Sequence, residues 1–194
     1  MSRLLVATTN LGKQDEFRRL LADLPGQIVT PDEVGVDLEV EEPYDTYAEN
    51  AIVKADAYAR AAGIPTLADD SGIEVAALDW GPGVRSARWR AGRTAEALLE
   101  AMDGITDRRA RMVCVVAVTE PSEGKGRTRT FQGVVEGSIA AERRGDNGFG
   151  YDPVFLLPSG QTTAELPPAE KDRLSHRGRA VAAAAGYLHE LLGR

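Results

Sequence analysis

Two adjacent carboxylates, Asp69 and Asp70, follow an apolar run in the segment IPTLADDSG. Carboxylate oxygens are ligands that Mg²⁺ prefers, and one or two protein carboxylates are enough when water and substrate phosphates complete the shell. Adjacent side chains of an extended segment point to opposite faces, so we expect one Asp to enter a cleft while the other fixes a turn at Ser71-Gly72. The segment therefore predicts a magnesium site, and a turn acid without chemistry is the alternative.

A second acidic group lies earlier in the chain and consists of Glu39, Glu41 and Glu42. Each of the three is a candidate for a second carboxylate on the same ion. We take Glu42 as a metal ligand together with Asp70. The alternative is an acidic run that is simply solvated.

The segment TTNLGK leaves a strand-like apolar run and enters a helix. Backbone N–H groups at a helix start, together with hydroxyls, an amide and a lysine, can bind phosphate oxygens. The segment lacks the GxxxxGK[ST] spacing of a P-loop, so an ordinary helix cap is the alternative. The residues expected to bind substrate here are Thr8, Thr9, Asn10, Leu11, Gly12 and Lys13.

The segment ENAIVKA places two polar side chains on one helix face. Asn50 and Lys54 are four residues apart and so are neighbours on a helix, whereas Glu49 fits a capping box with Thr46. We expect Asn50 and Lys54 to face one ligand. A solvated lysine on an alanine-rich helix is the alternative.

The segment NGFGYDP has residues suited to a nucleotide base. Gly148 and Gly150 flank Phe149, which suits an exposed loop that presents a ring to a flat base, and Tyr151 and Asp152 add polar edges. A strand entry with a core phenylalanine is the alternative.

The segment SHR places His176 and Arg177 at a helix start. There, backbone donors meet a guanidinium that is always charged. The two residues are candidates for ligand binding, and an N-cap followed by surface residues is the alternative.

The elements that must position these residues alternate between strands and helices, which predicts an α/β fold with a mixed sheet. Caps and glycines mark the helix ends. The two longest strands are expected to form an antiparallel hairpin around a loop that contains SEGKG. The expected elements are strands over 4–8, 110–119 and 127–139, and helices over about 13–23, 46–63, 94–104 and from a cap at Ser175 to about 192.

Composition indicates one globular domain over residues 1–194, because 43% of its residues are hydrophobic and no linker or repeat interrupts it. It lacks both a run of about 18 apolar residues and a signal-peptide h-region, so we expect a cytoplasmic protein without a membrane partner. A net charge of −7 argues against a nucleic-acid surface and permits a local cationic pocket. The single cysteine, Cys114, lies in an apolar run and is expected to be buried.

Six motifs together resemble those of the inosine/xanthosine triphosphate pyrophosphatases, house-cleaning enzymes that hydrolyse deaminated purine nucleotides. The resemblance covers nearly the whole chain. Its motifs, in the family's order, are TTNLGK at 8–13, TYAENAIVKA at 46–55, ADDSG at 68–72, GPGVRSAR at 81–88, FGYDP at 149–153 and EKDRLSHR at 170–177.

This resemblance implies roles for the matching residues. Asp70 would be a general base that also meets Mg²⁺, and Ser71 would lie beside the nucleotide. Lys54 and Lys171 would neutralise phosphate charge, and segment 8–13 would surround the phosphates. The residues implied to enclose the base are Phe149, Gly150, Tyr151, Asp152, His176 and Arg177.

The implied architecture has two α/β lobes around a long mixed β-sheet, with flanking helices and a central cleft that holds the site. The implied assembly is a homodimer. The implied partner is a small-molecule purine nucleoside triphosphate.

Together these implications predict Mg²⁺-dependent hydrolysis of ITP, dITP and XTP to the nucleoside monophosphate and pyrophosphate. Water would attack the α-phosphorus in line while cations spread the developing charge. Whether Asp70 is the base or only a metal ligand stays open. Arg177 can only donate hydrogen bonds, so it suits the 6-oxo group of hypoxanthine or xanthine and opposes the 6-amino group of adenine.

Two alternative functions remain at this point. One is a maf-type pyrophosphatase for modified nucleotides, against which the SHR and FGYDP motifs argue. The other is a nucleotide-binding regulatory module in which Asp70 performs no chemistry.

Overall fold

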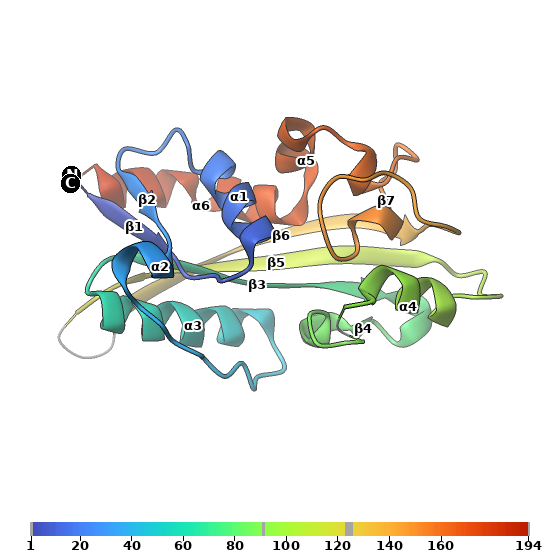
Figure 1. The fold of residues 1–194 in the computed structure, drawn as a ribbon, viewed down its shortest axis with the longest axis horizontal. Coiled ribbons are helices and arrows are strands. Elements are labelled where there is room, and N and C mark those ends of the chain that lie inside the picture. Colours follow the sequence, from blue (N-terminus) through green and yellow to red (C-terminus); the bar gives the residue numbers. More distant parts are fainter. Residues whose placement is uncertain (1, 91, 123–125, 194) are drawn as a thin grey trace. The chain divides into compact units, whose positions relative to one another are not determined.

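The computed structural model describes residues 2–90, 92–122 and 126–193, and its chain alternates between strands and helices (Figure 1). The helices are α1 Leu11–Leu20, α2 Pro31–Val34, α3 Tyr47–Ala62, α4 Thr94–Ala101, α5 Pro168–Leu174 and α6 His176–Leu192. The strands are β1 Arg3–Val6, β2 Gln27–Val29, β3 Thr66–Val75, β4 Gly81–Pro82, β5 Arg109–Glu120, β6 Arg127–Ile139 and β7 Phe155–Leu156. The expected α/β fold class is confirmed.

The strands form one mixed sheet in the order β2-β1-β3-β5-β6-β7, with β4 paired to β3. Strand β1 is parallel to β2 and β3, whereas the β3–β4 and β6–β7 pairs are antiparallel. Two contacts show that β5 and β6 also run antiparallel: the hydroxyls of Thr119 and Thr128 lie 2.8 Å apart, and Ile139 N donates to Arg108 O at 2.8 Å. The expected hairpin is thus confirmed, although 123–125 of its loop lie outside the described residues.

The chain divides into two compact units, and the division cuts β3 between Asp70 and Ser71. Unit 1 contains the described residues up to Asp70, Val115–Gln132 and those from Ala180 onward. Unit 2 contains Ser71–Cys114 and Gly133–Arg179. Within unit 1, α3 lies on one side of β1 and β3, and the carboxyl-terminal part of α6 lies on the other (Figure 1).

Side-chain caps set the starts of the helices that carry site residues. The Asn10 side chain accepts a hydrogen bond from Lys13 N at 3.0 Å, so α1 begins two residues earlier than expected. Thr46 caps α3 through Glu49, as predicted, and Gly63 ends that helix in the left-handed conformation. Ser175 accepts from Gly178 N at 3.1 Å, which confirms it as the cap of α6.

The expected turn at Ser71-Gly72 is wrong, because β3 continues as a strand through both residues to Val75. Beyond the glycine, the strand is held by Ser86, whose hydroxyl accepts from Ile73 N at 2.9 Å, and by pairing with β4. Asp69 and Asp70 therefore lie inside a strand, not at its end.

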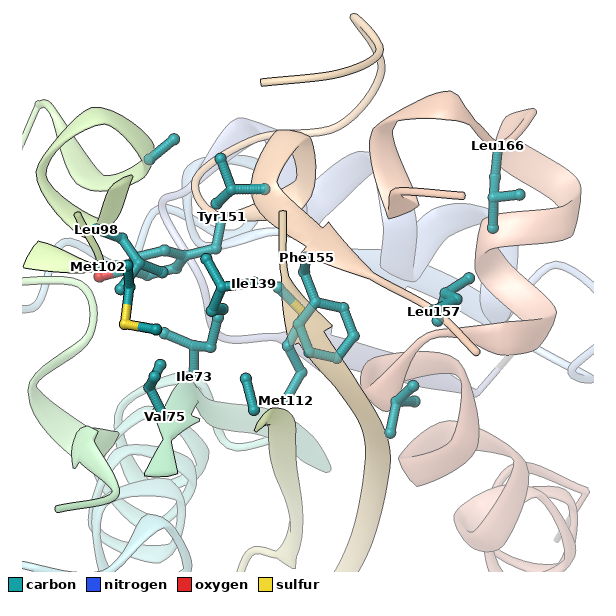
Figure 2. Packing of buried hydrophobic residues seen from close by; sticks show 14 residues of the cluster. Ile73, Val75, Leu98, Met102, Met112, Ile139, Tyr151, Phe155, Leu157 and Leu166 are labelled. Atoms are coloured by element: carbon teal, nitrogen blue, oxygen red, sulfur yellow. The ribbon is translucent and has the colours of Figure 1, made fainter. Parts of the chain in front are cut away.

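A hydrophobic core supports the site residues of unit 2 (Figure 2). It includes side chains from β3, α4, β5 and β6 together with the segment 151–157, and Phe155 at its centre is completely buried. Cys114 is buried, as expected. Among the described residues, no helix is both long enough and apolar enough to cross a membrane.

Candidate active site

The segment after β1 is shaped by hydrogen bonds among its own residues. Ala7 N donates to Leu67 O at 2.8 Å, which ties the end of β1 to β3. The chain then turns at Thr8, whose hydroxyl accepts from Asn10 N at 3.3 Å, and α1 begins at Leu11. This places the first turn of α1 next to the strand that carries the two aspartates.

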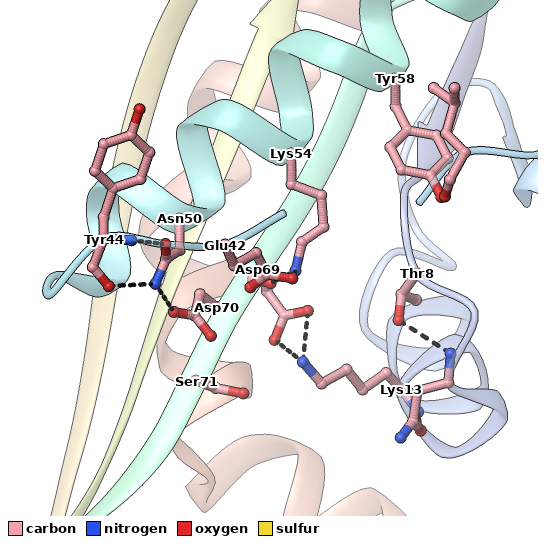
Figure 3. A network of polar contacts seen from close by, with 12 residues as sticks. Thr8, Lys13, Glu42, Tyr44, Asn50, Lys54, Tyr58, Asp69, Asp70 and Ser71 are labelled. Carbon is pink, nitrogen blue, oxygen red and sulfur yellow. Dashed lines mark hydrogen bonds and ion pairs between the residues drawn. The ribbon is translucent and has the colours of Figure 1, made fainter. Parts of the chain in front are cut away.

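Lys13 of this segment pairs with Asp69 of unit 1. Its Nζ lies 3.1 Å from Oδ1 and 3.0 Å from Oδ2 of that carboxylate (Figure 3). Asp69 is only 1% exposed, so a cationic partner is needed to offset the cost of burying its charge. The acid that we expected to fix a turn instead holds a lysine.

Helix α3 directs Asn50 and Lys54 to β3, so the expected shared face is confirmed (Figure 3). Lys54 Nζ donates to the Asp69 carbonyl at 2.9 Å and pairs with Glu42 Oε1 at 2.9 Å. Asn50 Nδ2 donates to Asp70 Oδ2 at 3.0 Å. One face of one helix thus contacts both aspartates.

Asp70 is a buried carboxylate close to two lysines. Burial raises the pKa of its carboxyl above the ordinary value, and the negative charge of Glu42 raises it further. The hydrogen bond from Asn50 and the charges of Lys54 and Lys13 lower the pKa but do not cancel the effect of burial. A carboxyl with a raised pKa is a better proton acceptor once ionised, as a general base requires.

The donor set around Asp70 fits a cation that takes few ligands from the protein. Among the described residues, no group of three or more His, Cys, Asp or Glu side chains could hold a metal ion. Asp70 and Glu42 nevertheless lie close enough for the charge of one to raise the pKa of the other. Two carboxylates with no third ligand match an ion whose remaining ligands are water and substrate phosphates.

A second group of predicted residues lies in unit 2 around Asp152. Its carboxylate accepts from Lys171 Nζ at 2.5 Å, from Phe149 N at 2.8 Å and from the Thr163 hydroxyl at 2.8 Å. Asp152 and Lys171 are both about 5% exposed. This buried ion pair fixes the backbone of the loop that carries Phe149.

The ring of Phe149 lies near two cations of unit 2. Lys171 Nζ is 5.1 Å and Arg177 Cζ is 5.8 Å from the ring centroid. Arg177 also donates to the Ser71 hydroxyl at 3.1 Å. These contacts bring together an aromatic face, hydrogen-bond donors and positive charge, a combination that suits a flat base with acceptor groups.

Tyr151 is directed away from this group. Its ring belongs to the core of unit 2, its hydroxyl donates to Ser86 O at 2.9 Å, and burial raises its pKa to about 12. The structure gives its side chain a packing role and offers no polar edge there for a base. The pattern FGYDP alone did not separate this outcome from the expected one.

The remaining predicted residues divide between exposed and buried positions. Thr9, Asn10, Leu11 and Gly150 are exposed, whereas His176 and Arg177 are buried at the start of α6. Thr8, Gly12 and Ser71 are half-buried. Sequence reasoning missed Thr163 and Ser86, which hold Asp152 and β3. Ser86 lies within the motif GPGVRSAR, in which no role was predicted for this residue, and Thr163 lies outside the six motifs. Each acts on a segment distant in the sequence.

Comparisons with known proteins find relatives over nearly the whole chain. The Ham1 family profile matches residues 4–187. A dITP/XTP pyrophosphatase of Symbiobacterium thermophilum is 46% identical, over 98% of this chain and 96% of the relative, and one of Syntrophobacter fumaroxidans is 44% identical, over 92% and 78%.

Solved structures with a similar fold cover nearly the whole chain as well. The HAM1 protein of Coxiella burnetii superposes with a TM-score of 0.85 at 41% identity, covering 98% of this chain and all of that one. The nucleoside-triphosphatase / dITP/XTP pyrophosphatase of Mycobacterium abscessus has a TM-score of 0.72 at 40% identity, covering 93% and 97%.

Substitution of two neighbouring glycines tests the role of the Asp152–Lys171 pair. Gly148 and Gly150 both have positive φ, 78° and 61°, so alanine at either costs about 1–2 kcal/mol of backbone strain. A Cβ on Gly148 would also meet Asp152 and Lys171, whereas one on Gly150 meets nothing.

We expect Gly148→Ala to lower the free energy of unfolding, measured by urea titration, by at least about 1 kcal/mol more than Gly150→Ala, since a disturbed buried pair is costly. If both variants lose the same free energy of unfolding, the Asp152–Lys171 pair tolerates displacement by the added Cβ.

A second prediction concerns the pH dependence of stability. The pKa of Asp70 is raised in the folded state above the ordinary value of 3.8. As pH rises past 3.8, Asp70 therefore ionises in the unfolded chain before it ionises in the folded protein. The free energy of unfolding falls over this range, until the pH passes the folded-state pKa. Asp70→Asn removes this loss and can still accept from Asn50. We expect its melting temperature to exceed that of the wild type at pH 7, with the difference shrinking towards pH 4. A variant that melts lower at pH 7 would contradict the sign.

Proposed function

This chain belongs to the Ham1 family, and from that premise we propose that it hydrolyses deaminated purine nucleoside triphosphates to the monophosphate and pyrophosphate. The observation that carries the proposal is Asp70, a buried carboxylate with a raised pKa that lies close to Lys13 and Lys54. Relatives more than 40% identical over nearly the whole chain are dITP/XTP pyrophosphatases. We propose ITP, dITP and XTP as the substrates.

In the proposed mechanism Asp70 orients the attacking water and accepts its proton. The water oxygen bonds to the α-phosphorus in line, and the bond from that phosphorus to the bridging oxygen of the β-phosphate breaks. The electron pair leaves with pyrophosphate. Lys13 and Lys54, already positioned by Asp69 and Glu42, compensate the charge that develops on the phosphate oxygens.

We propose Mg²⁺ as the cofactor, held by Asp70 and Glu42. When bound, it would supply Lewis-acid stabilisation of phosphate charge. The pairing of Glu42 with Lys54 holds this carboxylate within the same group of charges as Asp70.

We assign base recognition to the group around Phe149. The ring offers a face for stacking, and Arg177 supplies donors for a 6-oxo group. Lys171 belongs to this group through its contacts with Phe149 and Asp152. Its charge is offset by Asp152, so we assign it to the base side instead of the phosphates.

The proposed enzyme needs no nucleic-acid or membrane partner. A homodimer and a cytoplasmic location stay predictions, which the resemblance and the sequence respectively supply.

The decisive measurement is pyrophosphate and orthophosphate release, with and without Mg²⁺, from ITP, dITP, XTP, ATP, GTP and a modified pyrimidine triphosphate. We expect pyrophosphate from the deaminated purines only. Asp70→Asn should lose at least about 100-fold in kcat, the lower range for a general base. Activity on the modified pyrimidine alone would favour a maf-type enzyme, and tight binding of ITP without turnover would favour a regulatory module.

Base discrimination gives a separate prediction. Arg177→Ala removes the donor that suits a 6-oxo group, and a hydrogen bond to a charged group contributes about 1.5–3 kcal/mol. We expect the ratio of kcat/KM for ITP over ATP to fall about tenfold or more. The control is Arg179→Ala. Arg179 is an exposed arginine on the same helix as Arg177, and it donates to the Val134 carbonyl. This variant should leave the ratio unchanged. An unchanged ratio in Arg177→Ala would assign base reading to another residue.

A further inference from the structure

Asn50 has no exposed surface, although its side chain is fully polar. Its Oδ1 accepts from Tyr44 N at 3.0 Å, and its Nδ2 donates both to Tyr44 O at 3.1 Å and to Asp70 Oδ2 at 3.0 Å (Figure 3). A primary amide has two N–H donors, and both are used by these bonds. No donor is left for a substrate, and no surface is left for one to reach.

The two bonds to Tyr44 hold the backbone of the segment that carries Glu42. The Tyr44 side chain is 44% exposed, so burial of this side chain does little to hold the segment. The Asn50 amide pairs with both the N–H and the C=O of one residue, which fixes the position and the orientation of the peptide at once. The Tyr58 hydroxyl also holds this segment. It donates to Leu38 O at 2.7 Å, so the segment is bonded both before and after Glu42 in the sequence.

Helix α3 gives Asn50 a fixed position. Its backbone N–H donates to Thr46 O at 3.2 Å, so the residue lies in the first turn behind the Thr46–Glu49 cap. The next turn of the same face carries Lys54, which pairs with Glu42. These contacts of the 42–44 segment with α3 therefore come from one face of the helix.

We propose that Asn50 is a positioning residue that sets the distance between Asp70 and Glu42. One amide is bonded to the carboxylate of Asp70 and to the backbone two residues after Glu42. It therefore couples the two acids that the proposed function assigns to the cation. In this role Asn50 contacts neither substrate nor cation. The role replaces the direct ligand contact that the sequence predicted for Asn50. This inference rests on the proposed function.

The test compares Asn50→Ala, which removes all three bonds, with Asn50→Asp, which keeps the size and loses both donors. Binding of Mn²⁺, a paramagnetic probe, to the nucleotide-free protein is measured by electron paramagnetic resonance, and kcat and KM for ITP are measured separately. Loss of a group that orients metal ligands typically costs about 10–100-fold in metal affinity or activity. We expect the Mn²⁺ dissociation constant to rise and kcat to fall within that range, with KM changed less than about threefold.

The matched control is Thr66→Val. Thr66 is also completely buried, lies on the same strand as Asp70, and donates to the Ile64 carbonyl at 3.1 Å. Its loss should lower thermal stability without changing the Mn²⁺ dissociation constant or kcat. If the loss of any hydrogen bond from a buried side chain weakened Mn²⁺ binding, Thr66→Val and Asn50→Ala would show the same change.

The outcomes separate this inference from the proposed function. A large rise in KM for Asn50→Ala with unchanged Mn²⁺ binding would make Asn50 a substrate contact and overturn the inference while the enzyme stands. Unchanged Mn²⁺ binding and unchanged kcat would also overturn it. A wild type that binds Mn²⁺ but hydrolyses none of the triphosphates would reject the proposed function, and the Mn²⁺ comparison would still decide the role of Asn50. If Asn50→Ala does not fold, Asn50→Asp decides.

Discussion

Two negative charges buried next to each other on β3 determine much of the structure around them. Asp69 and Asp70 are both removed from water, and burying a carboxylate is costly unless it is paired or hydrogen-bonded. Lys13 pairs with the Asp69 carboxylate and Asn50 donates to that of Asp70, from two different helices. The positive charge of Lys54 also acts on Asp70. The same contacts leave one acid strongly paired and the other with a raised pKa, so neighbouring residues of one type acquire different chemistry.

Unit 2 also contains a buried carboxylate whose charge is compensated by neighbouring donors. Asp152 is buried and receives three donors, from Lys171, Thr163 and the backbone of Phe149. The ion pair holds a loop whose glycines have positive φ and whose aromatic ring faces two cations. In both units, a buried carboxylate positions a lysine before any substrate is present. The charge in each unit is thus held in place by the fold itself.

Membership of the Ham1 family confirms the resemblance that the six motifs indicated. Those motifs identify the family because each combines polar or charged residues with a local structural signal such as a helix cap. The Thr46–Glu49 cap, for example, specifies where α3 begins and hence that Asn50 and Lys54 share a face. The two longest strand segments, β5 and β6, likewise predict a hairpin, because strand propensity and a short connection are features of one stretch of chain.

The sequence by itself therefore determined the α/β class, most helices and long strands, and the set of polar residues worth examining. Only the tertiary structure decided what each of them contacts. Lys13 meets an acid 56 positions away, and Asn50 meets one 20 positions away. Asn50 is completely buried and links Tyr44 to Asp70, and the side chain of Tyr151 packs in the core of unit 2. The physical reason is that caps and periodicity act between near neighbours, whereas burial and charge pairing depend on distant segments that packing brings together.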